Sequence, residues 1–351
     1  MIYLYSGAGI PNFGDELIAA HWLRFVDGRP VVIDCFNVVR AKQSLSKINL
    51  SARFVRCIGK VSSISLSEMP AATFWDHVRF GRQCLNSKLG DAIRTHLSGI
   101  TQFHMIGGGY INSQWPQTGA LLGAALAIRE NLGIRIVGTG LGITPIPVPD
   151  DAGLARDVFG AFDIIELRDS EGFAFVKAHS PDANSANGTD DSFLYPVYKR
   201  EGQRAAHISC HYNGEMRADF IRIAKQALPN GLPTYFWSCH PERDCGAAMR
   251  EFFPDLIQLD CNDLLSCNHV APGDLMITSR FHPHLIAARA GAQGVFTSAT
   301  AYYDTKHRSI VDLGSGFGLE PGPNILAKRE MELVGEKRLI ANRLYPFSAA
   351  G

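Results

Sequence analysis

Short apolar segments alternate with segments of helical periodicity along most of the chain, and this alternation restricts the fold more than any other feature. A strand buried on both faces gives a continuous apolar run, whereas a covering helix has apolar residues three and four positions apart. The alternation is typical of a doubly wound, mostly parallel α/β sheet. The predicted strands lie near residues 2–5, 31–33, 54–58, 103–106, 134–138, 162–167, 205–210, 234–237, 256–259, 275–278 and 295–296.

The strand–helix series is interrupted once, between residues 180 and 204, where loop-forming and polar residues dominate. The chain has 351 residues, of which 46% are hydrophobic, and this is enough material for two cores. We therefore expect an N-terminal Rossmann-like domain over residues 1–200 and a C-terminal one over 201–320. Residues 321–351 are predicted to form a helix and tail that pack back across the cleft between the domains.

Composition and charge exclude several function classes. Lys+Arg and Asp+Glu both number 34, so the chain lacks the basic excess of a nucleic-acid-binding protein. It has no apolar stretch long enough to cross a membrane, and residues 1–5 are typical of a first strand rather than of a signal peptide. The eight cysteines form no C-x-x-C pair, which indicates free thiols in a reducing cytosol. We expect a cytoplasmic protein.

No metal or cofactor is predicted. The acidic pairs Asp15-Glu16 and Asp190-Asp191 are adjacent in sequence, and adjacent residues on a helix face different directions. The cysteines and histidines also lack the spacing of a zinc site.

Polar and glycine residues gather just after the predicted strands of both halves. In open α/β sheets, ligands bind outside the carboxyl ends of the strands. Arg280, His282 and His284 follow the strand 275–278; an arginine there can hold a carboxylate or phosphate, and a histidine can transfer protons. The other residues at such positions are Asn12, Asp15, Gly107, Gly108, Gly109, Arg168, Asp169, His211, His240, Asp244 and Lys306. They predict a cleft between two Rossmann-like domains.

Each of these residues also has a purely structural interpretation. Asp15 stands at a helix start, where a carboxylate caps free N–H groups. The three glycines from 107 to 109 fit a tight turn as well as a cradle for a phosphate or sugar oxygen. Arg168 can pair with Asp169, and His284 can simply begin a helix. The histidines His211 and His240 fit core or surface positions equally well.

Several motifs in the same order resemble the polysaccharide pyruvyl transferase family. The opening Asn12-Phe13-Gly14-Asp15-Glu16 is similar to its N-x-G-D-[DE] segment, and Ser279-Arg280-Phe281-His282 is similar to its s-R-x-H signature. The chain departs from the family at His211, where relatives often carry an arginine, and at the doubled histidine His282-Pro283-His284. The remaining matches are Gly107-Gly108-Gly109, Glu166-Leu167-Arg168-Asp169, Asp191-Ser192-Phe193-Leu194 and Tyr303-Asp304-Thr305-Lys306.

The resemblance implies a GT-B-like fold and an enzyme of polysaccharide biosynthesis, such as exopolysaccharide synthesis. It implies transfer of pyruvate from phosphoenolpyruvate to a sugar, a glycan or a lipid-linked oligosaccharide, with release of phosphate. A lipid-linked acceptor would place the enzyme at the inner face of the membrane, with at most peripheral contact. The sequence does not indicate the oligomeric state.

The implied mechanism assigns roles to particular residues. Arg280 would clamp the donor, Lys306 would hold its phosphate, and His282 would act as general acid. Asp15 would serve as base or acceptor ligand. The predicted donor pocket also includes His211 and His240, and the predicted acceptor side includes Asn12, Asp15, Gly107, Gly108, Gly109 and Arg168.

Two other functions remain open at this point. One is a GT-B glycosyltransferase with a nucleotide-sugar donor, which usually needs an acidic residue on the ribose; Glu242 and Asp244 are candidates. The other is a non-catalytic protein that binds sugar phosphates.

Overall fold

A computed structural model describes residues 1–244 and 246–346, and these divide into two compact units. Unit 1 contains Met1–Ile10 and Asp15–Leu194, and unit 2 contains Pro11–Gly14 and Tyr195–Pro346. The sequence placed the boundary near residue 200. Every strand pair in the described part of the chain is parallel, so the predicted α/β class is confirmed.

Unit 1 is built on a seven-stranded sheet in the order β3-β2-β1-β4-β5-β6-β7. All residues of β1, β2 and β4 are buried, as expected for strands covered on both faces. The strands are β1 (Ile2–Tyr5), β2 (Val31–Asp34), β3 (Arg53–Val55), β4 (Gln102–Met105), β5 (Arg135–Leu141), β6 (Ile164–Leu167) and β7 (Ser185–Asn187).

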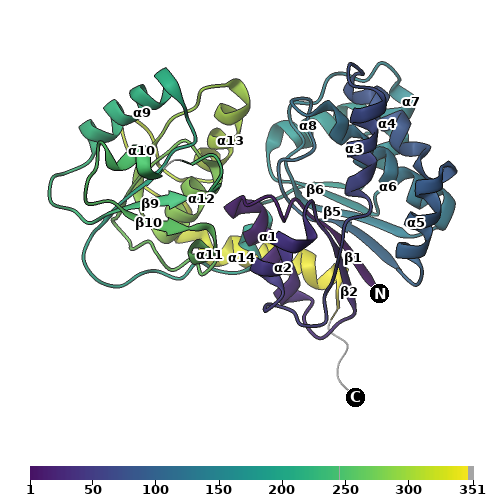
Figure 1. The fold of residues 1–351 in the computed structure, drawn as a ribbon, viewed down its shortest axis with the longest axis horizontal. Helices are drawn as coiled ribbons and strands as arrows, with labels where there is room; N and C mark the ends of the chain where they lie inside the picture. Colours follow the sequence, from purple (N-terminus) through teal and green to yellow (C-terminus); the bar gives the residue numbers. More distant parts are fainter. Residues whose placement is uncertain (245, 347–351) are drawn as a thin grey trace. The chain divides into compact units, whose positions relative to one another are not determined.

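The helices of unit 1 connect these strands, and α3, α4 and α6 lie side by side (Figure 1). The α-helices are α1 (Phe13–Phe25), α2 (Val38–Leu45), α3 (Gly59–Glu68), α4 (Phe74–Arg82), α5 (Lys88–Leu97), α6 (Gly119–Leu132), α7 (Ala152–Gly160) and α8 (Ser170–His179). Three short 3₁₀ turns are Cys84–Asn86, Pro116–Thr118 and Asp191–Leu194.

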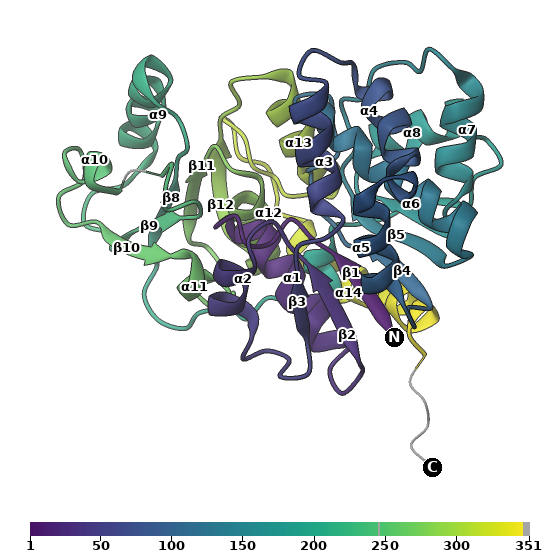
Figure 2. The same ribbon diagram turned by 45° about the vertical axis from the view of Figure 1, so that its right-hand side comes forward.

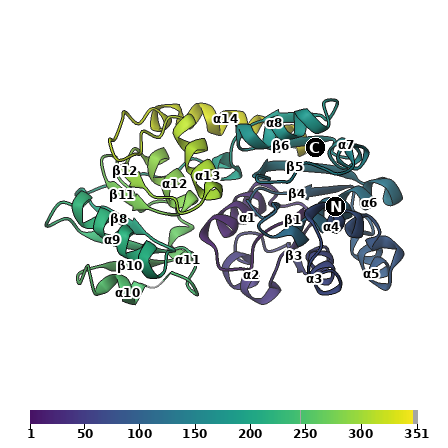
Figure 3. The ribbon, with the colours of Figure 1, turned by 90° about the horizontal axis from the view of Figure 1, so that it is seen from above.

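Unit 2 repeats the same construction with five strands in the order β10-β9-β8-β11-β12 (Figure 2). Its strands are β8 (Ala206–Ser209), β9 (Thr234–Ser238), β10 (Ile257–Asp260), β11 (Leu275–Thr278) and β12 (Gln293–Phe296). Figure 3 shows α12 beside α13. The helices are α9 (Gly214–Ala227), α10 (Gly246–Arg250), α11 (Cys261–Leu264), α12 (Phe281–Ala290), α13 (Ala301–Asp312) and α14 (Leu326–Leu344).

The last helix, α14, belongs to unit 2 and packs on α12. Fully buried Arg289 of α12 donates to both carboxylate oxygens of Glu330 on α14, at 2.9 Å each, and to the carbonyl of Tyr195. Breaking a buried pair of this kind leaves an uncompensated charge, so the pair holds α14 firmly to its own unit. The end of the predicted tail, residues 347–351, lies outside the described residues.

Two segments differ from the sequence-based expectation. Residues 185–187 were expected to be loop but form β7, because this edge strand is held by backbone pairing with β6 and has no apolar pattern to detect. The predicted strand 54–58 ends at Val55. The N–H groups of Cys57 and Ile58 donate to the carboxylate of Asp34, at 3.1 and 2.5 Å, and the chain turns into α3.

The cysteines of the described residues are free and buried, as expected for small apolar side chains. Burial raises the pKa of the Cys35, Cys57, Cys84 and Cys239 thiols to about 12. These thiols are therefore protonated and unreactive near neutral pH. Cys245 lies outside the described residues.

Candidate functional site

The carboxyl edge of the unit 2 sheet brings together most of the predicted donor residues. Strand β8 lies between β9 and β11, and parallel strands end at the same edge of a sheet. His211 follows β8, His240 follows β9, and Arg280 follows β11. Three residues far apart in sequence are thus placed at neighbouring strand ends, where an α/β sheet binds its ligands.

Arg280 forms an ion pair with Asp244, which follows β9 in the same unit. Asp244 is fully buried and its other carboxylate oxygen accepts the backbone N–H of His240 at 2.9 Å. Burial raises the pKa of Asp244 and the charge of Arg280 opposes that rise. The Nε of Arg280 is buried with no hydrogen-bond partner among the described residues. Arg280 therefore keeps donor capacity that Asp244 does not use.

His211 lies in a cationic environment. Its Nδ1 is 2.8 Å from the hydroxyl of Ser279, and its ring centroid is 4.7 Å from that of Tyr303. The pKa of His211 is lowered to about 3, chiefly by burial and in addition by electrostatic repulsion from Arg280, His307, Arg243 and Lys306. His211 is therefore neutral near pH 7.

His240 is affected in the same way. Burial lowers its pKa first, and the charges of Arg280 and Arg243 add to the effect. Its Nδ1 is buried and has no hydrogen-bond partner in the described part of the chain. Two neutral histidines at one strand edge, with Arg280 and Arg243 acting on both, make that edge suited to an anion.

Lys306 is held by two tyrosines on its own helix, α13. Its Nζ lies 3.9 Å from the ring centroid of Tyr302 and 5.7 Å from that of Tyr303, and it donates to the Tyr302 hydroxyl. Cation–π contacts of this kind fix the ammonium without neutralising it. The nearby acid Asp304 instead pairs with Arg308 at 2.6 Å.

The two histidines of the doubled motif have different surroundings. The ring of His282 packs directly on Gly14, where an added Cβ would lie 1.7 Å from Nδ1. His284 is fully buried, with Nδ1 2.9 Å from His307 Nδ1 and Nε2 3.0 Å from the Ser315 hydroxyl. It also stacks on Phe296 and Phe317. His284 is therefore part of the unit 2 core, and a core role is the one its contacts explain.

In unit 1, Asp15 lies against two of the predicted glycine turns. An added Cβ at Gly7 would be 2.9 Å from the Asp15 carboxyl carbon, and one at Gly108 would be 3.2 Å from Oδ1. Gly108 has φ +141, a conformation that favours glycine. Asp15 and the turn Gly107–Gly109, which the sequence assigned to the acceptor side, thus lie close together in unit 1. Asn12 belongs to the other compact unit, with Pro11–Gly14.

The glycine turn Gly107–Gly109 is hydrogen-bonded to the buried carboxylate of Asp191. Asp191 Oδ2 accepts the Gly107 N–H at 2.8 Å, the Trp22 indole N–H at 2.7 Å and the Thr139 hydroxyl at 2.8 Å. A turn whose N–H group already serves a carboxylate is a poor phosphate cradle. This arrangement favours the tight-turn interpretation of the turn over the phosphate one.

Arg168 forms a buried ion pair, but with a partner other than the one considered from the sequence. Its Nη1 is 2.7 Å from Asp190 Oδ2, and both side chains are at most 3% exposed. Asp169 instead caps α8 by accepting the Gly172 N–H at 2.7 Å. The suggested Arg168–Asp169 pair is wrong, because adjacent side chains point to opposite sides of the chain. These contacts account for Arg168 as a structural residue.

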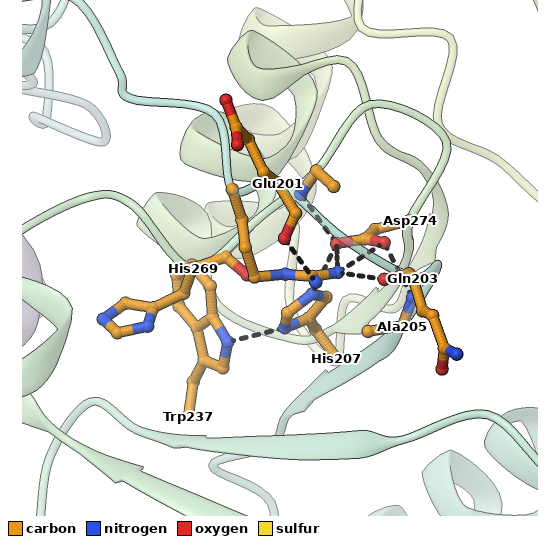
Figure 4. Close-up of polar contacts among 9 residues, drawn as sticks. Glu201, Gln203, Ala205, His207, Trp237, His269 and Asp274 are labelled. Carbon is orange, nitrogen blue, oxygen red and sulfur yellow. Dashed lines mark hydrogen bonds and ion pairs between the residues drawn. The ribbon is translucent and has the colours of Figure 1, made fainter.

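The opposite edge of the unit 2 sheet holds a polar network that sequence reasoning missed (Figure 4). Asp274, directly before β11, accepts hydrogen bonds from Arg200 at 3.0 Å and from the Ala205 and Ala271 N–H groups at 2.7 Å each. His207 Nε2 lies 3.1 Å from the same carboxylate, and its Nδ1 accepts the Trp237 indole N–H at 3.1 Å. The one sequence signal that could have indicated this network is the charged residue Asp274 immediately before the apolar strand β11.

No group of three or more His, Cys, Asp and Glu side chains in residues 1–244 and 246–346 is arranged to hold a metal ion. None of the helices in those ranges is long and apolar enough to cross a membrane.

No protein-family profile matches this sequence, and a comparison with curated proteins found no match. Solved structures do resemble it. The UDP-GlcNAc 2-epimerase from Neisseria meningitidis, bound to UDP-GlcNAc, has a TM-score of 0.52 and 9% identity over 97% of this chain and 93% of that one. HepE from Anabaena, in complex with UDP-glucose, has a TM-score of 0.53 and 12% identity over 98% of both chains.

The spinosyn rhamnosyltransferase SpnG has a TM-score of 0.53 and 12% identity over 97% of this chain and 96% of that one. At such identities the likeness establishes the fold. The chain has a GT-B-like fold with two Rossmann-like domains, as the sequence predicted.

Proposed function

We propose that this chain is a transferase that modifies a sugar and binds its anionic donor at the carboxyl edge of the unit 2 sheet. The observation that carries the proposal is the concentration of positive charge around neutral His211, to which Arg280, Arg243 and Lys306 contribute. A local excess of positive charge at a strand edge attracts phosphate and carboxylate groups. The GT-B-like fold is compatible with this role and does not by itself identify the donor.

Pyruvyl transfer from phosphoenolpyruvate is our first candidate, and it rests on the sequence motifs. The donor carries a carboxylate and a phosphate, which Arg280 and Lys306 would hold. The enol methylene takes a proton, for which His282 is the candidate acid. An acceptor hydroxyl then attacks the cationic carbon, phosphate leaves, and a second hydroxyl closes a cyclic ketal. Asp15 is the candidate base or acceptor ligand.

Glycosyl transfer from a nucleotide sugar is the second candidate, and the structural comparisons favour it over the first. HepE was solved with UDP-glucose and SpnG is a rhamnosyltransferase. One feature of this chain weighs against it: Asp244, a candidate for binding the ribose, is already bonded to Arg280 and to the His240 N–H. The other candidate, Glu242, is exposed. A protein that only binds sugar phosphates would have the same charges without turnover.

The deciding experiment offers both donors to the purified protein. Phosphate release from phosphoenolpyruvate is measured against a panel of sugars, glycans and glycolipids, and UDP release is measured from UDP-sugars with the same acceptors. Acceptor-dependent phosphate release, lowered about 100-fold in Arg280→Lys, is the expected result. Turnover of a UDP-sugar alone would overturn pyruvyl transfer in favour of glycosyl transfer. Binding of either donor without turnover would overturn both reactions.

A further inference from the structure

Ser279, at the end of β11, makes two hydrogen bonds to His211. Its hydroxyl oxygen accepts the backbone N–H of His211 at 3.2 Å, and the same oxygen lies 2.8 Å from the imidazole Nδ1. Ser279 is fully buried. The residue therefore fixes both the main chain and the ring of His211.

The hydrogen of this hydroxyl needs an acceptor, because a buried donor without one costs about 1–3 kcal/mol. In residues 1–244 and 246–346, the acceptor within reach of the Ser279 hydroxyl is His211 Nδ1. Ser279 thus donates to Nδ1, and Nδ1 carries no proton. In a neutral imidazole the proton must then be on Nε2.

The Nε2 atom lies on the far side of the ring from Ser279. It makes no hydrogen bond to the described residues, and it is not among their enclosed, unpartnered atoms. It is therefore open to a ligand. The ring contacts those of Tyr212 and Tyr303, with centroid distances of 4.6 and 4.7 Å.

We propose that Ser279 is a positioning residue that locks His211 in its neutral Nε2–H form, so that His211 donates one uncharged hydrogen bond to an anionic phosphate-type ligand. This inference rests on the proposed function, because it assumes that the donor binds at this strand edge. It adds how His211 would recognise a phosphate-type group of that donor. A phosphate-type oxyanion would gain a directed donor in addition to the charges of Arg280 and Lys306, both of which act on His211. This donor adds no positive charge of its own.

The charged groups around the ring preserve this form. Burial comes first in lowering the pKa of His211, to about 3, and Arg280, His307, Arg243 and Lys306 act in the same direction. Protonation would also place a hydrogen on Nδ1, facing the Ser279 hydroxyl hydrogen. His211 should therefore not titrate between pH 5 and pH 8, where an ordinary histidine does.

The first test uses no substrate. Two-dimensional ¹H–¹⁵N spectra of the ¹⁵N-histidine-labelled full chain are recorded from pH 5 to pH 8, with the His211 signal assigned from His211→Gln. A constant Nε2–H pattern is expected. Removing the hydroxyl in Ser279→Ala should give mixed tautomers or titration within this range, and Ser279→Thr should restore the single form. An Nδ1–H pattern in the unchanged protein, or titration near pH 6.5, would overturn the proposal.

The second test uses inorganic phosphate as the probe, followed by the same signal. Ser279→Ala should weaken phosphate binding about tenfold, as expected for losing one fixed hydrogen bond to a charged group. The matched control is Ser315→Ala, which removes a serine hydroxyl from buried His284 instead, 3.0 Å from Nε2. Ser315→Ala should change the affinity for phosphate by less than about twofold relative to the unchanged protein. Equal weakening in both variants would overturn the positioning role.

The two proposals fail separately. A locked Nε2–H tautomer without turnover of either donor would contradict the transferase and leave the role of Ser279 intact. Turnover with a freely titrating His211 would contradict the role of Ser279 alone.

Discussion

Strand β11 has an arginine–aspartate pair at each end, and the two pairs are used differently. At its amino end, Arg200 donates to both carboxylate oxygens of Asp274, at 3.0 and 3.1 Å. At its carboxyl end, Arg280 pairs with Asp244. Both aspartates are completely buried, so burial alone does not distinguish the pairs.

The number of hydrogen bonds does distinguish them. Every nitrogen of the Arg200 guanidinium has an acceptor: besides Asp274, it donates to the carbonyls of Glu201, Gln203 and His269. Arg280 has a buried Nε without one in the described residues. A saturated pair has nothing left for a ligand, whereas an unsaturated pair at a strand end can bind one.

The pKa values of the two aspartates, Asp274 and Asp244, differ in the same way. Burial raises the pKa of Asp274, but hydrogen bonds from His207, Ala271, Ala205 and Arg200 outweigh it and bring the value down to about 2. In Asp244, burial outweighs the bonds from Arg280 and His240, and the pKa is raised. The amino-end pair is therefore tuned for stability, and the carboxyl-end pair is left incompletely stabilised.

The largest expected effect is on stability, from Asp274→Asn. Removing the charge leaves the partly buried Arg200 against a neutral amide, and one donor would face another. Breaking a buried pair costs about 3–5 kcal/mol. Urea unfolding, followed by hydrogen exchange of the β8 and β11 amides, should show this loss. The control Asp255→Asn, at an exposed position, should change stability by less than about 0.5 kcal/mol. Equal stability of the two variants would contradict the structural role of the amino-end pair.

Arg280→Lys should produce the next largest effect, and on the donor rather than on stability. A lysine keeps the charge but loses the planar fork. We expect kcat/KM for the donor to fall about 100-fold, equivalent to about 2.7 kcal/mol. Arg200→Lys is the matched control, because it makes the same change at the amino end of β11 and should leave kcat/KM within about twofold. If both variants lose donor turnover equally, the contrast between the two pairs is wrong.

Asp274 should also give unit 2 an acid-labile component of stability. Its folded-state pKa of about 2 lies below the ordinary value of 3.8, so between these values the unfolded chain binds more protons than the folded one. Stability is then fully present above about pH 4 and is lost as the pH falls toward 2, by about 2 kcal/mol. Unfolding measured from pH 5 to pH 2.5 should show this slope in the unchanged protein. A slope that persists undiminished in Asp274→Asn would assign it to other groups.

Arg243→Gln should have the smallest effect. Arg243 is exposed, and it contributes to the positive field around His211 and His240. We expect KM for the donor to rise about threefold, and less at high salt, since exposed charges are screened. Arg250→Gln, at the exposed end of α10, should leave KM unchanged. A KM increase that is independent of salt would indicate direct contact with the donor instead.

The strand ends were predictable because the sequence pattern is local. Apolar runs located β8, β9 and β11, and the parallel topology then placed His211, His240 and Arg280 at one edge. The hydrogen-bond partners were not predictable in this way. Arg200 and Asp274 are 74 residues apart, and Asp191 is 84 residues from Gly107. No local pattern records which of many carboxylates reaches a given N–H group.

The sequence by itself determined that this chain folds into parallel α/β units with polar residues at its strand ends, because the periodicity of buried strands and amphipathic helices is written in consecutive residues. Only the tertiary structure decided which polar residues are used up by the fold. In the folded chain, Arg168 pairs with Asp190, Asp191 bonds the glycine turn, and His284 is buried. The Nε of Arg280 and the Nε2 of His211 make no hydrogen bond to the described residues. The physical reason is that a buried polar group must find its partner in space, wherever the chain brings one.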